Sequence, residues 1–402
     1  MVDLDTRTVA LHPLTFVDEG DEVVVGRADI ESYAVLSADG AAVLRRLGEG
    51  MTPAHVATWY EQTYDEALDI ADFLVQVGEL GFLRPDQPAG PPARPEPAAT
   101  AADVRPLRFQ RTASLVYSRA GALVAAVIAA AAGWSMVTRP QTRPSATHVF
   151  FTGYLVLIPL VMIAVELPLM YLHELSHVLA GRRIGIRSRV GIGRRLYFVV
   201  FQTTLTGVYS VPRRQRYLIF LAGMITDSMV LCTLVLISAA TIDGPAQLVG
   251  RIAVAAAYFT GMRFAWQFLF FLETDMHHVL SSLLKITDLK GMTRSVLRAR
   301  LRRQPLDPSF TPHERAVLRW FAPLTAAGIV LTVGGGLATI GPVVVTYLRQ
   351  VAEGIATGAT STQFWDAVIS LAMVIGQFSL VAVLSLGSRG KNRPAAHTHS
   401  AA

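Results

Sequence analysis

The sequence predicts a multi-pass α-helical membrane protein of about six spans, with a small β element in a cytoplasmic loop and an α+β domain at the N-terminus. Of its 402 residues, 52% are hydrophobic and only 16% are charged, which is apolar for a soluble chain. Six apolar stretches are each long enough to cross about 30 Å of hydrocarbon. Charge is also divided unevenly, because residues 1–84 carry a net −11 and the remainder carries +17. This asymmetry indicates a soluble module joined to a membrane module.

The N-terminal domain, residues 1–84, begins with the runs EVVVG and SYAVL, whose β-branched and aromatic residues predict a pair of strands. Three helices follow. ADGAAVLRRLG predicts a first helix that ends at Gly48, and MTPAHVATWYEQTY predicts a second, with Thr52 as N-cap and Pro53 at its first position. Apolar residues at helical spacing over residues 65–83 predict the third. Strands followed by three helices, the last ending in GFL, predict a winged helix-turn-helix.

A linker rich in proline and alanine, residues 85–113, separates this domain from the membrane domain at residues 114–390. Residues 391–402 are expected to form a disordered tail. The acidic start of the chain does not resemble a signal peptide. The single cysteine, Cys232, excludes an intrachain disulfide framework and a cysteine-rich metal site.

Basic residues predict how the spans are oriented. The predicted spans cover residues 114–137, 149–180, 217–242, 248–272, 316–348 and 363–386. Arginine and lysine are concentrated after the second and fourth spans, so the positive-inside rule places both termini in the cytoplasm. We interpret these residues as topology signals that contact membrane lipids, and we expect no nucleic-acid partner. Residues 196–211, in the first cytoplasmic loop, are strand-like and could form a hairpin against the membrane face.

The motif HELSH at residues 173–177 has the ligand spacing of a zinc hydrolase. His173 and His177 are four residues apart and share one face of a helix, so they can offer two imidazoles to one Zn²⁺, with Glu174 beside them as a base. A chance match and a polar core contact are the alternatives. Because ionisable side chains inside a span are costly, a functional site is the default interpretation.

A catalytic zinc needs a third protein ligand. Asp275 follows the fourth predicted span, and Asp227 lies inside the third, at a comparable depth. Helix geometry alone leaves both candidates open. Glu166 is two turns before His173, too far along the helix to share the metal, so we interpret it as a helix-packing residue.

HELSH in a second span, a basic strand-like loop and an aspartate after a later span together resemble the site-2 protease family of intramembrane zinc metalloproteases, over about residues 114–390. The stretch TDMHHVLSSLLKITDLKG is similar to one in the bacterial peptide zinc metalloproteases. This resemblance implies Asp275 as the third ligand, with Asp227 as a second choice or a substrate-orienting residue. It also implies that Glu174 is the catalytic base and that the loop strands present the substrate.

The chain departs from the family pattern at several positions. Met276 replaces the usual glycine, the usual Asn-Pro upstream is absent, and Gln267 is the nearest amide. The Gly-Pro-x-x-Asn of the next span appears only as GMITD, with Gly223 and Asp227. His277 and His278 are additional candidate ligands, and we favour a headgroup-level or outer role for them. No substrate-binding residue can be named.

The N-terminal domain has the wrong charge for binding DNA, which needs a basic face. Over about residues 12–84 it resembles instead the peptide recognition element of pathways that modify ribosomally made peptides. That resemblance implies that a leader peptide adds as a strand beside residues 32–36 and packs on the helix at residues 65–80. A regulatory or interaction domain is the alternative.

Together, the two resemblances imply an intramembrane zinc endopeptidase that removes the leader from a ribosomally synthesised, modified peptide, as in daptide-type biosynthesis. One alternative is regulated intramembrane proteolysis of a signalling or anti-sigma protein. Another is a non-catalytic transporter or immunity protein. The sequence leaves the oligomeric state open.

Overall fold

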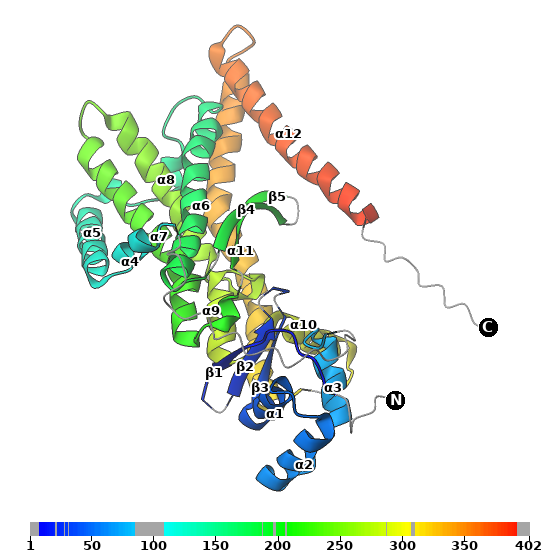
Figure 1. The fold of residues 1–402 in the computed structure, drawn as a ribbon. Coiled ribbons are helices and arrows are strands. Elements are labelled where there is room, and N and C mark those ends of the chain that lie inside the picture. The colour runs from blue at the N-terminus through cyan, green and yellow to red at the C-terminus, as the bar shows by residue number, and fades with distance from the viewer. Residues whose placement is uncertain are drawn as a thin grey trace. The chain divides into compact units, whose positions relative to one another are not determined.

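The computed structural model describes residues 8–391, except residues 21, 28, 31, 85–107, 187, 196–197, 206, 287 and 307–309. The chain divides into two compact units, whose elements are labelled in Figure 1. Unit 1 comprises Met1–Leu115, Val178–Arg189 and Thr204–Ile219, and unit 2 comprises the rest of the chain. Most of the predicted linker and all but the first residue of the predicted tail lie outside the described residues.

Unit 1 contains a three-stranded antiparallel sheet followed by three helices. The strands are β1 (Thr15–Asp18), β2 (Glu22–Arg27) and β3 (Ser32–Ser37), in the order β1-β2-β3. The helices are α1 (Ala38–Gly48), α2 (Pro53–Tyr64) and α3 (Ile70–Glu79). The two predicted strands and the three predicted helices are present. The sequence missed β1, because four residues are too few to show an alternating pattern.

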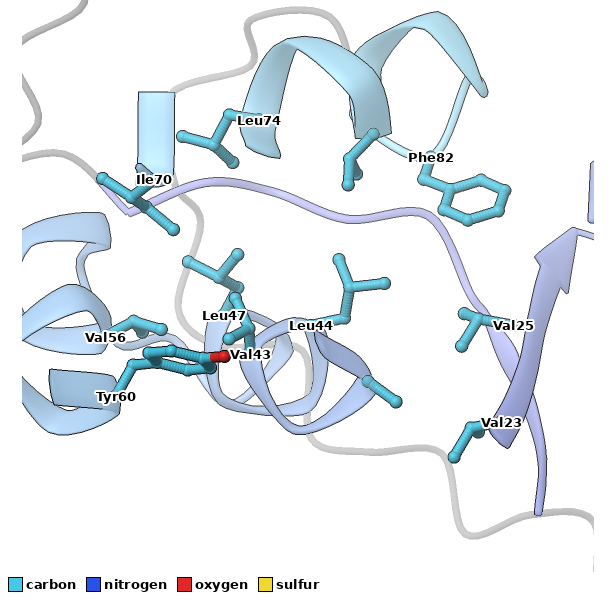
Figure 2. Packing of buried hydrophobic residues seen from close by; sticks show 12 residues of the cluster. Val23, Val25, Val43, Leu44, Leu47, Val56, Tyr60, Ile70, Leu74 and Phe82 are labelled. Carbon is cyan, nitrogen blue, oxygen red and sulfur yellow. The ribbon is translucent and has the colours of Figure 1, made fainter. Parts of the chain in front are cut away.

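Apolar side chains from the sheet and the helices form the core of this domain (Figure 2). Val23 and Val25 point from β2 to the helix side, where they meet Leu44, Leu47 and Phe82. A side-chain cap sets the N-terminus of α2. As predicted, the Thr52 hydroxyl accepts a hydrogen bond from the backbone N–H of His55 and caps the helix.

The other face of the sheet meets a segment that precedes α7 (Arg213–Thr241) and belongs to the same unit. This segment includes the 3₁₀ turn η3 (Val208–Ser210). The rings of Tyr33 and Tyr209 lie 5.5 Å apart, and the Ser210 hydroxyl is 3.2 Å from that of Thr15. Buried Glu19 forms ion pairs with Arg213 and, at 3.0 Å, with Arg216. The acidic domain is thus held to a basic segment by both packing and charge.

Unit 2 is built mainly from helices. Besides α7 they are α5 (Arg119–Thr138), α6 (Leu157–Arg183), α8 (Gln247–Trp266), α9 (Asp275–Leu284), α10 (Leu289–Arg302), α11 (Pro312–Ala356) and α12 (Thr362–Lys391), while the short α4 (Gln110–Val116) precedes α5.

Helices α11 and α12 run antiparallel (Figure 1). Gly354 lets them approach closely, because a Cβ there would lie 2.8 Å from that of Ala367. Next to Ala367 on α12, Asp366 accepts hydrogen bonds from the backbone N–H groups of residues 155 and 156, just before α6.

Five of the described helices, rather than the six predicted, are long and apolar enough to cross a membrane: α5, α6, α7, α11 and α12. The fourth predicted span, residues 248–272, forms α8 and the short 3₁₀ turn η4 (Phe270–Leu272). Two arginines, Arg251 and Arg263, lower the hydropathy of α8. Its middle, Ala253–Ala257, is buried, and such small side chains let neighbouring helices approach closely.

The strand-like loop forms a two-stranded sheet of β4 (Ser188–Arg195) and β5 (Phe198–Leu205). The predicted strand region, residues 196–211, contains β5 but ends in the turn η3. The strand β4 was not predicted, because its alternating arginines and glycines indicated only a basic segment. The predicted hairpin is therefore present, with its first strand earlier in the chain.

Candidate metal centre

His173, His177 and Asp275 form a buried group that could hold a metal ion. The two histidines lie one turn apart on α6, and Asp275 is the first residue of α9. Their Nε2 atoms are 3.3 Å apart, and the Asp275 Oδ2 atom lies 3.2 Å from one and 3.3 Å from the other. The three ligand atoms therefore form a nearly equilateral triangle.

The size of this triangle fits tetrahedral zinc. With Zn–N and Zn–O bonds of about 2.0–2.1 Å, tetrahedral angles require ligand atoms about 3.3–3.4 Å apart. The Asp275 Oδ2 atom is also buried without a hydrogen-bond partner, and a cation would satisfy it.

Gln267 fixes the start of α9, where Asp275 stands. Its backbone carbonyl accepts a hydrogen bond from the Thr274 hydroxyl at 2.7 Å. Its side-chain oxygen accepts one from the backbone N–H of Asp275 at 3.2 Å. In the sequence, Gln267 was noted only as the amide nearest to Asp275. In the structure it connects the end of α8 to this third candidate ligand.

Asp227, which the sequence left as an alternative ligand, lies on the opposite side of the His173 ring. Its Oδ2 atom is 2.9 Å from His173 Nδ1 and is buried. This carboxylate accepts the Nδ1–H, which leaves the Nε2 lone pair directed at the candidate metal position. The structure thus brings Asp275 to the ligand triangle and Asp227 to the outer nitrogen.

Arg263 on α8 joins this arrangement to a second acid. Its Nη2 atom donates to Asp227 at 2.9 Å, and its Nη1 atom donates to Glu166 at 2.7 Å. One guanidinium therefore links α6, α7 and α8 through charge-assisted hydrogen bonds. Sequence reasoning missed Arg263. An arginine inside an apolar helix, with acids in two neighbouring spans, was the available signal.

Gly223 brings the backbone of α7 against both imidazoles. A Cβ atom at this position would lie 2.4 Å from His173 Nε2 and 2.5 Å from His177 Nε2, too close for any side chain. The resemblance had marked this glycine without giving a physical reason. The structure supplies one, since only glycine lets α7 pass so near the ligand atoms.

Glu174 is oriented by the hairpin. The Thr203 hydroxyl, on β5, lies 2.7 Å from the Glu174 Oε2 atom and 2.9 Å from the backbone carbonyl of the same residue. Another hydroxyl, that of Tyr117, donates to the carbonyl of Ser176 at 3.1 Å. Neither Thr203 nor Tyr117 was predicted from the sequence, because each contact joins segments distant in the chain.

Comparisons with protein-family models, curated proteins and solved structures found no match. The function is therefore argued from the geometry of the site.

His277 and His278 lie outside the ligand triangle. His277 Nδ1 is 2.6 Å from the carbonyl of Phe270, and the ring of His278 stacks on Phe220 at 5.5 Å. Each imidazole thus has a packing or hydrogen-bonding contact within α9 and its neighbours. The group that could bind a metal offers three protein ligands, one orienting carboxylate and one adjacent glutamate.

Proposed function

We propose that this chain is an intramembrane zinc endopeptidase. The observation that carries the proposal is the triangle of His173, His177 and Asp275, whose two histidines lie on a helix able to cross a membrane. Three protein ligands leave the fourth tetrahedral position for water, which is the ligand count of catalytic rather than structural zinc sites. Two imidazoles and one carboxylate are ligands that suit Zn²⁺.

A bound Zn²⁺ would polarise the scissile carbonyl and lower the pKa of a water molecule. Glu174 takes a proton from that water as its oxygen bonds to the carbonyl carbon. The glutamate then delivers the proton to the amine that leaves when the C–N bond breaks. Thr203 supports this role because its hydroxyl, 2.7 Å from Glu174 Oε2, holds the carboxylate in one orientation.

The proposed substrate is a peptide or a membrane-associated polypeptide in extended form. A helical substrate hides its amide bonds, so it must unwind before cleavage. The hairpin of β4 and β5 offers strand edges for main-chain pairing, and Thr203 links it directly to Glu174. We propose that α8 also crosses the membrane, as the predicted fourth span, so that six crossings put both chain termini in the cytoplasm and the site opens toward that side.

The N-terminal domain supports a more specific substrate, a precursor with a leader peptide. β3 is an edge strand of the described sheet, and Ser32 at its start donates a hydrogen bond to the carbonyl of Leu80 at 2.8 Å. The strand edge and the end of α3 are therefore adjacent, as a leader that adds to β3 and packs on α3 would require. A labelled leader should bind the full chain and lose affinity when residues 1–84 are deleted. Unchanged affinity would disprove leader recognition by this domain.

Glu174→Gln tests the enzyme proposal. Because glutamine keeps the shape but cannot accept the proton, the variant should retain zinc, measured by elemental mass spectrometry, and lose peptide cleavage. Cleavage is measured by comparing the new peptide N-termini in vesicles that carry the wild-type protein with those in vesicles that carry the variant. The substrate need not be known beforehand. Glu353→Gln, on an exposed part of α11, is the matched control. The same new N-termini in Glu174→Gln vesicles would refute the proposal.

A further inference from the structure

A cavity of about 310 Å³ lies among η4, α9, α10 and α11. Its wall includes Phe271, Arg294, Arg298 and Thr325 but none of the three candidate metal ligands. Phe271 packs against α11 where Gly328 leaves room, since a Cβ there would lie 2.5 Å from the ring. The cavity thus combines an aromatic wall, a hydroxyl and cationic groups.

The cationic side of the cavity is a stripe on α10. Lys290, Arg294 and Arg298 recur every four residues, so they share one helix face with about 5–6 Å between neighbours. Lys290 pairs with Glu273 at 2.5 Å, whereas the described residues place no carboxylate within ion-pair distance of Arg294 or Arg298. The opposite face of α10 packs on α11. Two exposed arginines therefore line the cavity without a partner anion among the described residues.

Thr325 supplies a second, independent sign of a ligand. Its side chain is 8% exposed and lines the cavity, yet its Oγ1 atom is buried without a hydrogen-bond partner among the described residues. Buried hydroxyls are nearly always hydrogen-bonded, because leaving one unpaired is costly. A ligand oxygen in the cavity would satisfy it.

Apolar side chains continue the cavity toward the outside. Leu301 is 86% exposed and Ile329 is 49% exposed, and both line it. The helix α11 that carries Ile329 is a candidate membrane span. Arg319 and Trp320, one to two turns before Thr325, form the basic and aromatic pair typical of a membrane interface. Ile329, further along α11, would face acyl chains rather than water, and Leu301 follows Arg300, which lies beside Arg319 at the interface level.

We propose that this cavity binds one anionic phospholipid. Its phosphate sits between Arg294 and Arg298, an ester oxygen accepts the Thr325 hydroxyl proton, and one acyl chain follows Leu301 and Ile329. The two arginines favour an anionic ligand, and the apolar side chains of Leu301 and Ile329 favour one with an acyl chain. A free phosphate or an acidic peptide would contact only the basic part of the cavity. The helix α9 begins with Asp275 and also lines the cavity through His277. The bound lipid therefore packs against the helix that carries the third candidate ligand.

Native mass spectrometry of the full chain in micelles, titrated with phosphatidylglycerol or phosphatidylcholine, tests this proposal. Each basic residue near an anionic lipid contributes roughly a factor of five in binding, so Arg294→Gln/Arg298→Gln should weaken phosphatidylglycerol binding about 30-fold. Thr325→Val keeps the volume and removes one hydrogen bond, so about a fivefold loss is expected. Phosphatidylcholine binding should remain weak and unchanged in every variant.

Arg302→Gln/Arg303→Gln is the matched control, since it removes the same charge from exposed residues outside the cavity. An equal loss in this control would show general attraction to anionic lipid and overturn the site. Competition by glycerol phosphate as effective as that by the lipid would instead identify a soluble phosphate ligand and also overturn it. Lipid binding is measured without zinc or cleavage, so its outcome is independent of the proposed protease activity.

Discussion

At the scale of single residues, the candidate metal centre depends on an absent side chain as much as on those present. The imidazoles of His173 and His177 fill the space in which a Cβ on residue 223 would stand. A Cβ atom does not fit at residue 223 unless an imidazole or the α7 backbone moves, because Cβ atoms do not approach other heavy atoms within 3.0 Å. A glycine in α7 therefore determines how closely that helix can approach the ligands on α6.

Gly223→Ala should lower zinc affinity by at least about tenfold, a loss comparable to that of an outer-shell partner. The added methyl group pushes at least one imidazole out of the ligand triangle. Zinc retained after dialysis against a graded chelator measures the effect. Gly261→Ala is the control, because its Cβ would lie 3.7 Å from the nearest atom, on Leu231. Equal zinc retention in both variants would contradict this reading of Gly223.

Arg263→Met should destabilise the folded protein by about 3–5 kcal/mol, because it leaves Asp227 and Glu166 as buried carboxylates without a cation. Unfolding in mixed micelles with rising SDS measures the change. Glu166→Gln alone should cost less, since Arg263 retains Asp227. The double variant Arg263→Met/Glu166→Gln should recover part of the loss. No recovery would show that the two residues are not coupled.

At the scale of elements, the site depends on helix ends and strand edges. α9 begins at Asp275 because Gln267 and Thr274 connect it to the end of α8. Glu174 is held by a strand rather than by its own helix. The HELSH histidines could be predicted from the sequence because their relationship is local, with one helix turn between them. Arg263 and Thr203 could not, because their partners are set by tertiary packing.

Glu19→Gln should loosen the contact between the acidic domain and the segment that precedes α7. The change leaves Arg213 and Arg216 facing a neutral amide at a position that is only 5% exposed. Hydrogen exchange over residues 207–212 should rise about tenfold as this segment opens locally. Glu22→Gln, a less buried neighbour 3.4 Å from Arg213, should raise exchange less. Equal exchange in both variants would assign no special role to Glu19.

At the scale of the whole molecule, composition correctly indicated a mostly helical chain with long apolar helices and a small sheet near the N-terminus. Five of the described helices have the length and hydropathy of a span where six were predicted, because a window of apolar residues does not distinguish a lipid-facing helix from one packed among others. α8 is the example, with a buried alanine-rich middle and two arginines. The strands β1 and β4 were missed because one is short and the other is basic.

Six crossings, with α8 as the fourth, make a prediction for the orientation of the whole chain. In a Cys232→Ser background, Gln141→Cys between α5 and α6 and Arg302→Cys on α10 should react from opposite sides of the membrane. A membrane-impermeant maleimide, applied to intact cells and to inverted vesicles, measures the side. Only Gln141→Cys should be labelled in intact cells. Labelling of both from the same side would reverse the topology assigned here.

The ion pair between Arg263 and Glu166 also bears on biosynthesis, because its two partners are 97 residues apart in the chain. At about 5–20 residues per second, ribosomes make the cation roughly 5–20 s after the acid. Until then, α6 carries two carboxylates and two imidazoles that are costly in hydrocarbon. The newly made helix must therefore wait in polar or proteinaceous surroundings, and the candidate ligands on α6 and α9 can meet only after α8 and α9 have been synthesised.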